Sequence, residues 1–101
     1  MDDFPFEEQV ICEWDEPGSD GREVIRTFSD KVDPADLIWH RDREFRNITV
    51  LDSNGWQFQL EDQLPVKLKQ GDFLQIPPAT YHRVIKGDGP LVVYIWMSLD
   101  K

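Results

Sequence analysis

Cysteine and histidine are the scarcest reactive residues in this chain of 101 residues, which holds one cysteine and two histidines. A single thiol, Cys12, cannot form an intramolecular disulfide, so the sequence excludes a disulfide scaffold and favours a reducing, cytoplasmic compartment. No other residue stands at metal-ligand or nucleophile spacing from Cys12, which predicts a buried structural thiol. The chemistry of the chain must be sought at other residues.

Long hydrophobic runs are missing as well. The longest unbroken apolar run covers residues 91–97, which is too short to cross a bilayer. The amino terminus is acidic, whereas a signal peptide begins with a basic region. These features predict a soluble protein that is neither inserted in a membrane nor exported.

Basic residues are few, with 11 Lys and Arg against 20 Asp and Glu and a net charge of −9. This balance argues against nucleic acid or an anionic membrane surface as a partner. Eight of the 20 acids fall in residues 1–20, which contain no Lys or Arg, so the remainder is nearly neutral. We predict an acidic, flexible leader over residues 1–6 and one folded domain over residues 7–101. The acidic end could instead form a patch that attracts cations or maintains solubility.

Apolar residues are sufficient for a folded core, at 40% hydrophobic and 12% aromatic. No helical periodicity of useful length occurs, whereas short apolar or alternating runs recur between Gly, Pro, Asn and Asp, which predicts an all-β fold. A sandwich or barrel suits many short strands, and barrel closure removes exposed strand edges. The expected strands cover residues 9–14, 23–28, 37–40, 46–51, 56–61, 66–69, 72–76, 81–85 and 91–97.

Three connections carry specific turn chemistry. Residues 15–21 contain Pro and two Gly and are predicted to form a loop, and the Asn54-Gly55 pair favours a hairpin turn. Asp33 followed by Pro34 predicts a single helical turn with Asp33 as its N-cap.

The two histidines define the candidate site. On extended chain, His40 and Asp42 share one face because of their i, i+2 spacing, and His82 on a neighbouring strand would complete a set of two histidines and one carboxylate. Such a set leaves coordination positions open and is associated with non-haem Fe(II). Imidazole also suits Zn, Mn and Ni, so the ligand set does not identify the metal. Each histidine alone is more often a hydrogen-bonded structural residue.

Two motifs carry a family resemblance. The segment GDFLQIPPATYH, residues 71–82, resembles the second motif of the cupin superfamily, G-D-x-x-x-I-P-x-G-x-x-H, with Ala79 where the family usually has Gly. Upstream, His40-Arg41-Asp42 and the later VLDS of residues 50–53 resemble the first motif, H-x-H-x(3,4)-E followed by V-L-x-G. The resemblance covers residues 37–86, about half of the chain.

This resemblance implies a double-stranded β-helix, or jelly-roll, barrel of a small single-domain cupin. It implies metal ligands at His40 and His82 by direct match and at Asp42 by position, while Arg46 stands where the family has a glutamate. Arg46 either turns to an anionic substrate or belongs to a degenerate barrel without metal. Glu44 shares the phase of His40 and Asp42 and is a reserve ligand if the strand bulges.

The expected ligand is a small, anionic molecule. Arg46 would bind it bidentately, and Gln57 and Gln59 would line the site if the polar face of their strand points inward. Three functions remain open: a metal-dependent dioxygenase or isomerase, a non-catalytic binder of small molecules, and a metal-free barrel. The resemblance also implies a homodimer that pairs through residues 7–14.

Overall fold

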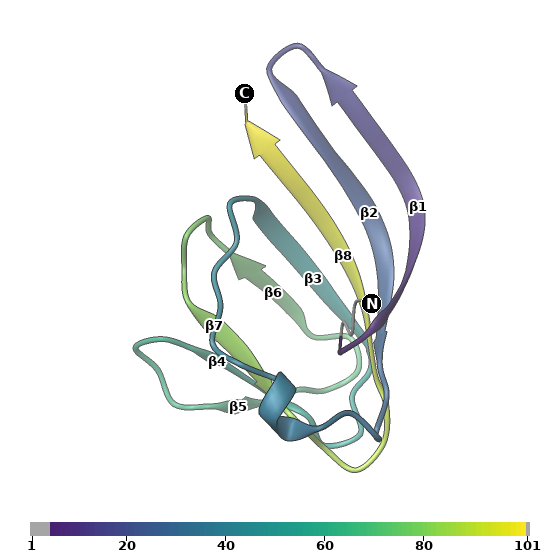
Figure 1. Cartoon of the computed structure of the whole chain (residues 1–101), viewed down its shortest axis with the longest axis vertical. Helices are drawn as coiled ribbons and strands as arrows, with labels where there is room; N and C mark the ends of the chain where they lie inside the picture. Colours follow the sequence, from purple (N-terminus) through teal and green to yellow (C-terminus); the bar gives the residue numbers. More distant parts are fainter. Residues whose placement is uncertain (1–4, 101) are drawn as a thin grey trace.

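Two β-sheets face each other across a shared core in the computed structural model, which describes residues 5–100 (Figure 1). The larger sheet has the strand order β1-β2-β8-β3-β6 and the smaller has the order β5-β4-β7, and every pairing is antiparallel. The larger sheet contains β1 (Glu7–Glu16), β2 (Ser19–Phe28), β8 (Leu91–Asp100), β3 (Phe45–Asp52) and β6 (Phe73–Ile76). The smaller contains β5 (Val66–Lys67), β4 (Gln57–Leu60) and β7 (His82–Ile85). The predicted all-β class is confirmed.

Alternation along the strands places the core between the sheets. On β8, Leu91, Val93, Ile95 and Met97 are all buried, while the residues between them are partly exposed. The smaller sheet contributes Phe58, which is also buried. Apolar residues at every second position therefore form one face of each sheet, as period-2 patterning requires.

The predicted helical turn is confirmed as a 3-10 helix, η1 (Pro34–Asp36). The Asp33 side chain accepts a hydrogen bond from the Ala35 amide at 3.0 Å, and Pro34 occupies the first turn, where a missing N–H costs nothing. No helix in residues 5–100 is long and apolar enough to span a membrane.

Two expected connections differ in the structure. The predicted loop at residues 15–21 is a tight hairpin, because β1 runs to Glu16 and β2 begins at Ser19. The turn at Asn54 and Gly55 forms with both φ angles positive, at 45° and 82°, as the pair predicts. It joins β3 to β4, which belong to different sheets, so it crosses between the sheets rather than closing a hairpin.

Two further expectations were wrong. Residues 37–40 do not form a strand, and only His40 makes an isolated bridge. No neighbouring strand pairs with Ile38 and Trp39, which are 66% and 38% exposed. Cys12 is exposed rather than buried, since it lies on β1, the edge strand of the larger sheet. Of the expected leader, residues 1–4 lie outside the described residues, and Phe6 packs against Phe28 with ring centroids 5.4 Å apart.

Candidate functional site

His40 and His82 are held opposite each other by two backbone hydrogen bonds. The amide of His40 donates to the carbonyl of His82 at 3.0 Å, and the amide of His82 donates to the carbonyl of His40 at 2.9 Å. The imidazole rings lie edge to face with centroids 4.3 Å apart. This bridge brings together two histidines that are far apart in the sequence.

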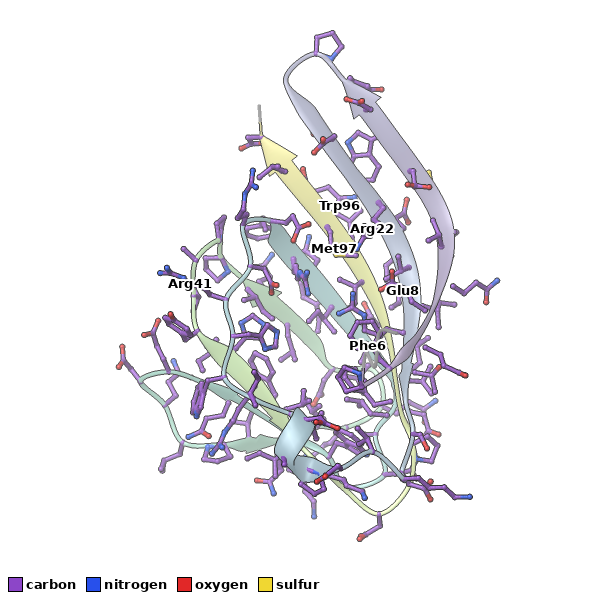
Figure 2. The ribbon with its side chains drawn as sticks, in the orientation of Figure 1. Phe6, Glu8, Arg22, Arg41, Trp96 and Met97 are labelled. Carbon is purple, nitrogen blue, oxygen red and sulfur yellow. The ribbon has the colours of Figure 1, made fainter. Side chains whose placement is uncertain are left out.

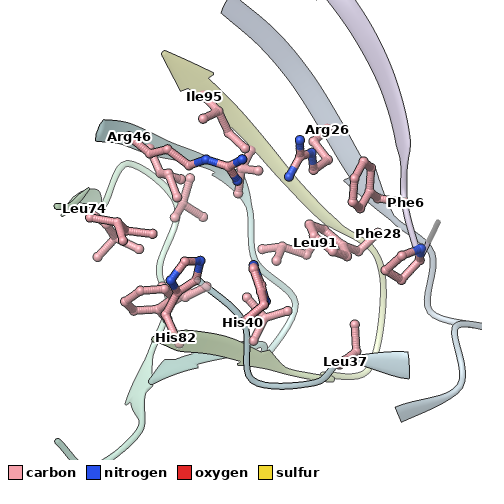
Figure 3. Close-up of a pocket in the computed structure, with 18 of the residues that line it drawn as sticks. Phe6, Arg26, Phe28, Leu37, His40, Arg46, Leu74, His82, Leu91 and Ile95 are labelled. Carbon is pink, nitrogen blue, oxygen red and sulfur yellow. The ribbon is translucent and has the colours of Figure 1, made fainter. Parts of the chain in front are cut away.

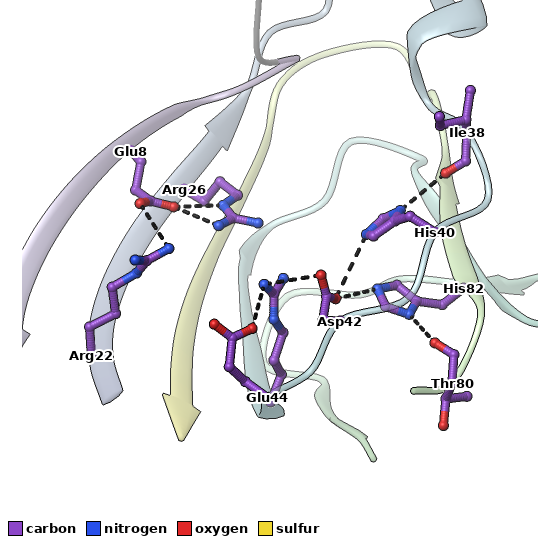
Figure 4. Close-up of polar contacts among 10 residues, drawn as sticks. Glu8, Arg22, Arg26, Ile38, His40, Asp42, Glu44, Thr80 and His82 are labelled. Carbon is purple, nitrogen blue, oxygen red and sulfur yellow. Dashed lines mark hydrogen bonds and ion pairs between the residues drawn. The ribbon is translucent and has the colours of Figure 1, made fainter. Parts of the chain in front are cut away.

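Both imidazoles have one nitrogen committed to the backbone. Nδ1 of His40 lies 3.1 Å from the carbonyl oxygen of Ile38, and Nδ1 of His82 lies 2.8 Å from that of Thr80 (Figure 4). A carbonyl oxygen only accepts hydrogen bonds, so Nδ1 must carry the proton. In the neutral rings Nε2 is then left with a free lone pair, the form in which histidine binds a metal.

Asp42 completes the cluster from the segment that follows His40. Its backbone carbonyl accepts a hydrogen bond from the amide of Ala79 at 2.7 Å, which ties the segment to the turn before β7. Its Oδ2 atom lies 3.3 Å from Nε2 of His82 and 3.9 Å from Nε2 of His40. The structure thus brings the three predicted ligands together, with their ligand atoms within 4.8 Å of one another.

The site favours the ionised carboxylate and the neutral imidazole. Burial raises the pKa of Asp42, but the contact with a protonated His82 and the charges of Arg46 and a protonated His40 outweigh burial, so this pKa is below its ordinary value and the carboxyl group is ionised. Burial lowers the pKa of His40, and the charge of Arg46 adds to this effect, which favours the neutral ring. An ionised carboxylate and a neutral imidazole are the forms that ligate a metal.

The other oxygen of Asp42 faces Arg46. Nη2 of Arg46 lies 3.3 Å from Oδ1 of Asp42 and 3.2 Å from Oε1 of Glu44. Arg46 is only 8% exposed and points inward. Glu44 accepts a hydrogen bond from Arg46 and lies outside the three-residue cluster.

A second buried arginine, Arg26 on β2, was missed by the sequence analysis. Its Nε and Nη2 atoms donate to Oε1 of Glu8 at 2.9 and 2.6 Å, and its guanidinium lies 3.8 Å from the centroid of the Phe6 ring. Figure 2 shows Glu8 on β1, the strand next to β2. The sequence contains a signal for this residue. In a strand, Arg26 lies on the same face as Val24 and Phe28, so its side chain is expected to point inward.

The two histidines and two arginines line a cavity of about 440 Å³ between the sheets, hereafter the core cavity (Figure 3). Most of the other lining side chains are apolar, among them Phe58, Leu74 and Ile95. Volume and lining are typical of a small-molecule site, with an apolar wall and a few convergent polar groups.

Gln57 and Gln59 do not line this cavity. Phe58 between them points into the core, so the two amides lie on the opposite face of β4. Gln59 is used there, because it accepts a hydrogen bond from Nε of Arg83 at 2.9 Å and donates one to the carbonyl of Gln63 at 3.0 Å.

The three residues fit a metal ion. Oδ2 of Asp42 is buried and has no hydrogen-bond partner among the described residues. It faces lone pairs on Nε2 of His82 and His40, and three electron-rich atoms at such separations require a cation or a proton between them. Two ligands that each lie about 2.0–2.2 Å from one tetrahedral ion are about 3.4 Å apart, close to the 3.3 Å between His82 and Asp42.

Comparison with known proteins finds similarity in structure alone. No protein-family model matches the chain, and no curated protein matches its sequence. A cupin domain from Bordetella pertussis is 16% identical, with 100% of this chain and 98% of that chain covered and a TM-score of 0.61. KdgF from Halomonas sp. is 17% identical, with 92% and 80% covered and a TM-score of 0.66.

A third similar structure is the DMSP lyase DddQ from Ruegeria pomeroyi, at 13% identity and a TM-score of 0.66. The match covers 91% of this chain and 46% of that chain, so the present chain spans less than half of the lyase. Sequence identities this low indicate a shared fold and do not indicate a shared reaction.

Proposed function

We propose that this chain, whose fold is that of the cupins, is a metalloprotein that binds one divalent metal ion through Nε2 of His40, Nε2 of His82 and Oδ2 of Asp42. The observation that carries the proposal is the buried Oδ2 atom of Asp42, which has no hydrogen-bond partner among the described residues. It faces the Nε2 atoms of two imidazoles whose ring proton is on Nδ1, where it is donated to a backbone carbonyl. The fold agrees with the motif resemblance from which the same three residues were predicted.

The bound metal would act as a Lewis acid on a small, anionic molecule in the core cavity. The chain's own residues shape that site in three ways. The carbonyls of Ile38 and Thr80 hold the imidazoles in the required tautomer, Arg46 orients the Asp42 carboxylate, and the apolar wall excludes water. A dioxygenase and an isomerase are both compatible with open coordination positions beside such a cavity.

One observation favours a second candidate, a metal-free binding protein. Arg46 pairs with Asp42 at 3.3 Å, and this contact partly neutralises the carboxylate without any metal. In that case the cavity would bind a ligand through its arginines alone.

Metal content of the purified protein decides between these candidates. The protein is loaded with Fe²⁺, Zn²⁺, Mn²⁺ or Ni²⁺, and gel filtration removes the unbound metal. Elemental mass spectrometry should then find about one metal ion per chain. The variants His82→Ala and Asp42→Asn should lose it. Glu44→Gln is the matched control, because Glu44 contacts Arg46 but lies outside the cluster. Substoichiometric metal that is unchanged in His82→Ala would leave the metal-free protein as the answer.

Turnover separates an enzyme from a carrier once metal is bound. An oxygen electrode with Fe²⁺-loaded protein and a panel of small carboxylic acids should show oxygen consumption only for a dioxygenase. Proton NMR of the same mixtures under nitrogen detects an isomerase. No change in any mixture would favour a binding protein.

A further inference from the structure

Two arginines face the core cavity from the larger sheet. Arg26 on β2 and Arg46 on β3 are each 8% exposed, and β8 runs between their strands. Figure 3 shows the two guanidinium groups turned toward each other, with His40 and His82 below them in this view. Two buried like charges on one cavity wall favour an anion between them.

Both guanidinium groups retain donors for such an anion. The bonds of Arg26 to Glu8 use Nε and Nη2, which leaves Nη1 for another acceptor. Arg46 uses Nη2 for Asp42 and Glu44, which leaves its Nη1 for another acceptor. Hydrogen bonds from charged donors to a ligand oxygen are stronger than those between neutral groups.

The charges of the site favour a single negative charge on the ligand. Arg26 is balanced by Glu8, and Arg46 is balanced by Glu44. A divalent ion on two neutral histidines and the Asp42 carboxylate adds one positive charge. Asp36 also lines the cavity, but its side chain is exposed, so solvent screens its charge and leaves the buried positive charge largely unbalanced. A monoanion therefore neutralises the loaded site, whereas a dianion leaves an excess negative charge in an apolar cavity.

The remaining wall defines the body of the ligand. Phe58, Leu74, Val84 and Leu91 are among the apolar side chains of the cavity, and they offer no hydrogen bonds to hydroxyl or amide groups. Sugars and other polyols would bury unpaired hydroxyls here, which costs free energy for each group. The volume of about 440 Å³ suits a molecule of modest size.

We infer that the core cavity binds a small monocarboxylate with an apolar body, whose carboxylate lies between Arg26 and Arg46 and whose hydrocarbon part lies against the apolar wall. This inference rests on the proposed function, because the metal ion supplies the unbalanced positive charge and lies next to the bound molecule. It assigns Arg26, a residue outside both motifs, to ligand binding.

The test uses three probes of equal length, hexanoate, 1-hexanol and hexylamine, in calorimetric titration of the Zn²⁺-loaded protein. Hexanoate should bind about tenfold or more tighter than hexanol, as expected for hydrogen bonds to charged groups, and hexylamine should not bind. Arg26→Gln and Arg46→Gln should weaken hexanoate by a similar factor and change hexanol binding by less than about twofold. Equal affinity for hexanoate and hexanol in the wild type would overturn the inference.

Arg22 provides a matched control. It lies on β2 with its side chain 41% exposed, it also pairs with Glu8 at 3.8 Å, and it does not line the core cavity. Arg22→Gln should leave the hexanoate affinity within about twofold of the wild type, and an equal loss in Arg22→Gln and Arg26→Gln would contradict a specific role of Arg26. If Arg26→Gln does not fold, Arg26→Lys retains the charge without the planar fork and should give an intermediate loss.

The metal and the carboxylate are read out separately. Metal content is measured on Arg26→Gln, which should retain one ion per chain because Arg26 does not contact the cluster. A wild type that holds metal but does not prefer hexanoate removes this inference alone. A wild type without metal removes the proposed function, and its preference between hexanoate and hexanol still reports on the arginine pair.

Discussion

His40 and His82 donate a backbone hydrogen bond to each other, at 3.0 and 2.9 Å, although His40 lies outside the strands. The pair therefore forms an isolated β-bridge, which positions two imidazoles from opposite ends of residues 37–86, the region that carries the two motifs. Because Ala79 and Asp42 are joined by a third bond of 2.7 Å, the segment from His40 to Asp42 is pinned along the turn before β7. The backbone thus sets the geometry of the cluster without a metal.

Metal binding should stabilise the fold. A ligand that binds only the folded state at 100 times its Kd adds about 2.7 kcal/mol to the free energy of unfolding. For a domain of this size that corresponds to a rise in Tm of about 10–20 °C, measured by scanning calorimetry with and without metal. EDTA should reverse the rise, and His82→Ala should show none. An equal rise in His82→Ala would place the binding elsewhere.

The turn before β7 contains a strained residue. Ala79 has a φ of 61°, in the left-handed region that costs a residue with a Cβ about 1–2 kcal/mol. Glycine avoids this cost but loses about 0.5–1 kcal/mol more conformational entropy on folding. We expect Ala79→Gly to raise the free energy of unfolding by about 0.5–1 kcal/mol in urea titrations.

A control for Ala79→Gly lies in η1. Ala35 has an ordinary helical environment, so Ala35→Gly should gain nothing and lower stability slightly. A loss of stability in Ala79→Gly equal to that in Ala35→Gly would show that the backbone at residue 79 relaxes when the side chain is removed.

The three-residue cluster was predicted from the resemblance of two sequence motifs, because the i, i+2 spacing of His40 and Asp42 is by itself a weak signal. Only the second motif places His82 beside them. The strand expected over residues 37–40 failed because Ile38 and Trp39 resemble a strand in composition, yet no neighbouring strand covers them. A hydrophobic run reports propensity, whereas a strand also needs a pairing partner.

Arg26 illustrates what local patterns leave out. Its charge is compensated by Glu8, its register partner on β1. That pairing depends on how β1 and β2 align, and the alignment contains a bulge between Val10 and Cys12. The phase that Arg26 shares with Val24 and Phe28 indicates an inward side chain, but the residue that compensates its charge follows only from the register.

The edge strand β1 should mediate a homodimer. It has 10 residues, most of them exposed, and Val10 and Ile11 are 48% and 51% exposed. An uncovered edge strand of this length readily pairs with a second copy. We expect a dimer in light scattering and a monomer for Ile11→Pro, which removes a backbone donor from the strand. Leu64→Pro, at a more exposed loop position, should remain dimeric, and a monomeric wild type would contradict the prediction.

The stability of the metal-free protein should fall as the pH drops below about 6.5, the ordinary pKa of histidine. The pKa of His40 is lowered in the folded state, chiefly by burial, so the unfolded chain takes up the proton first. Stability is therefore complete above the unfolded pKa and declines as the pH falls toward the folded pKa. Asp42 also has a lowered pKa, but its contribution is lost only at more acidic pH, below the ordinary aspartate range.

His40→Gln isolates this effect, because it removes the titrating group and leaves His82 and Asp42 in place. Urea unfolding in EDTA from pH 8 to pH 5 should show the wild type losing stability relative to His40→Gln only below about pH 6.5. The side chain of His40 is 48% exposed, so solvent screening keeps the difference small. A constant difference across this range would mean that His40 has the same pKa in the folded and unfolded chain. If the wild type instead gained stability relative to His40→Gln as the pH fell, the neighbouring carboxylate, rather than burial, would dominate the pKa of His40.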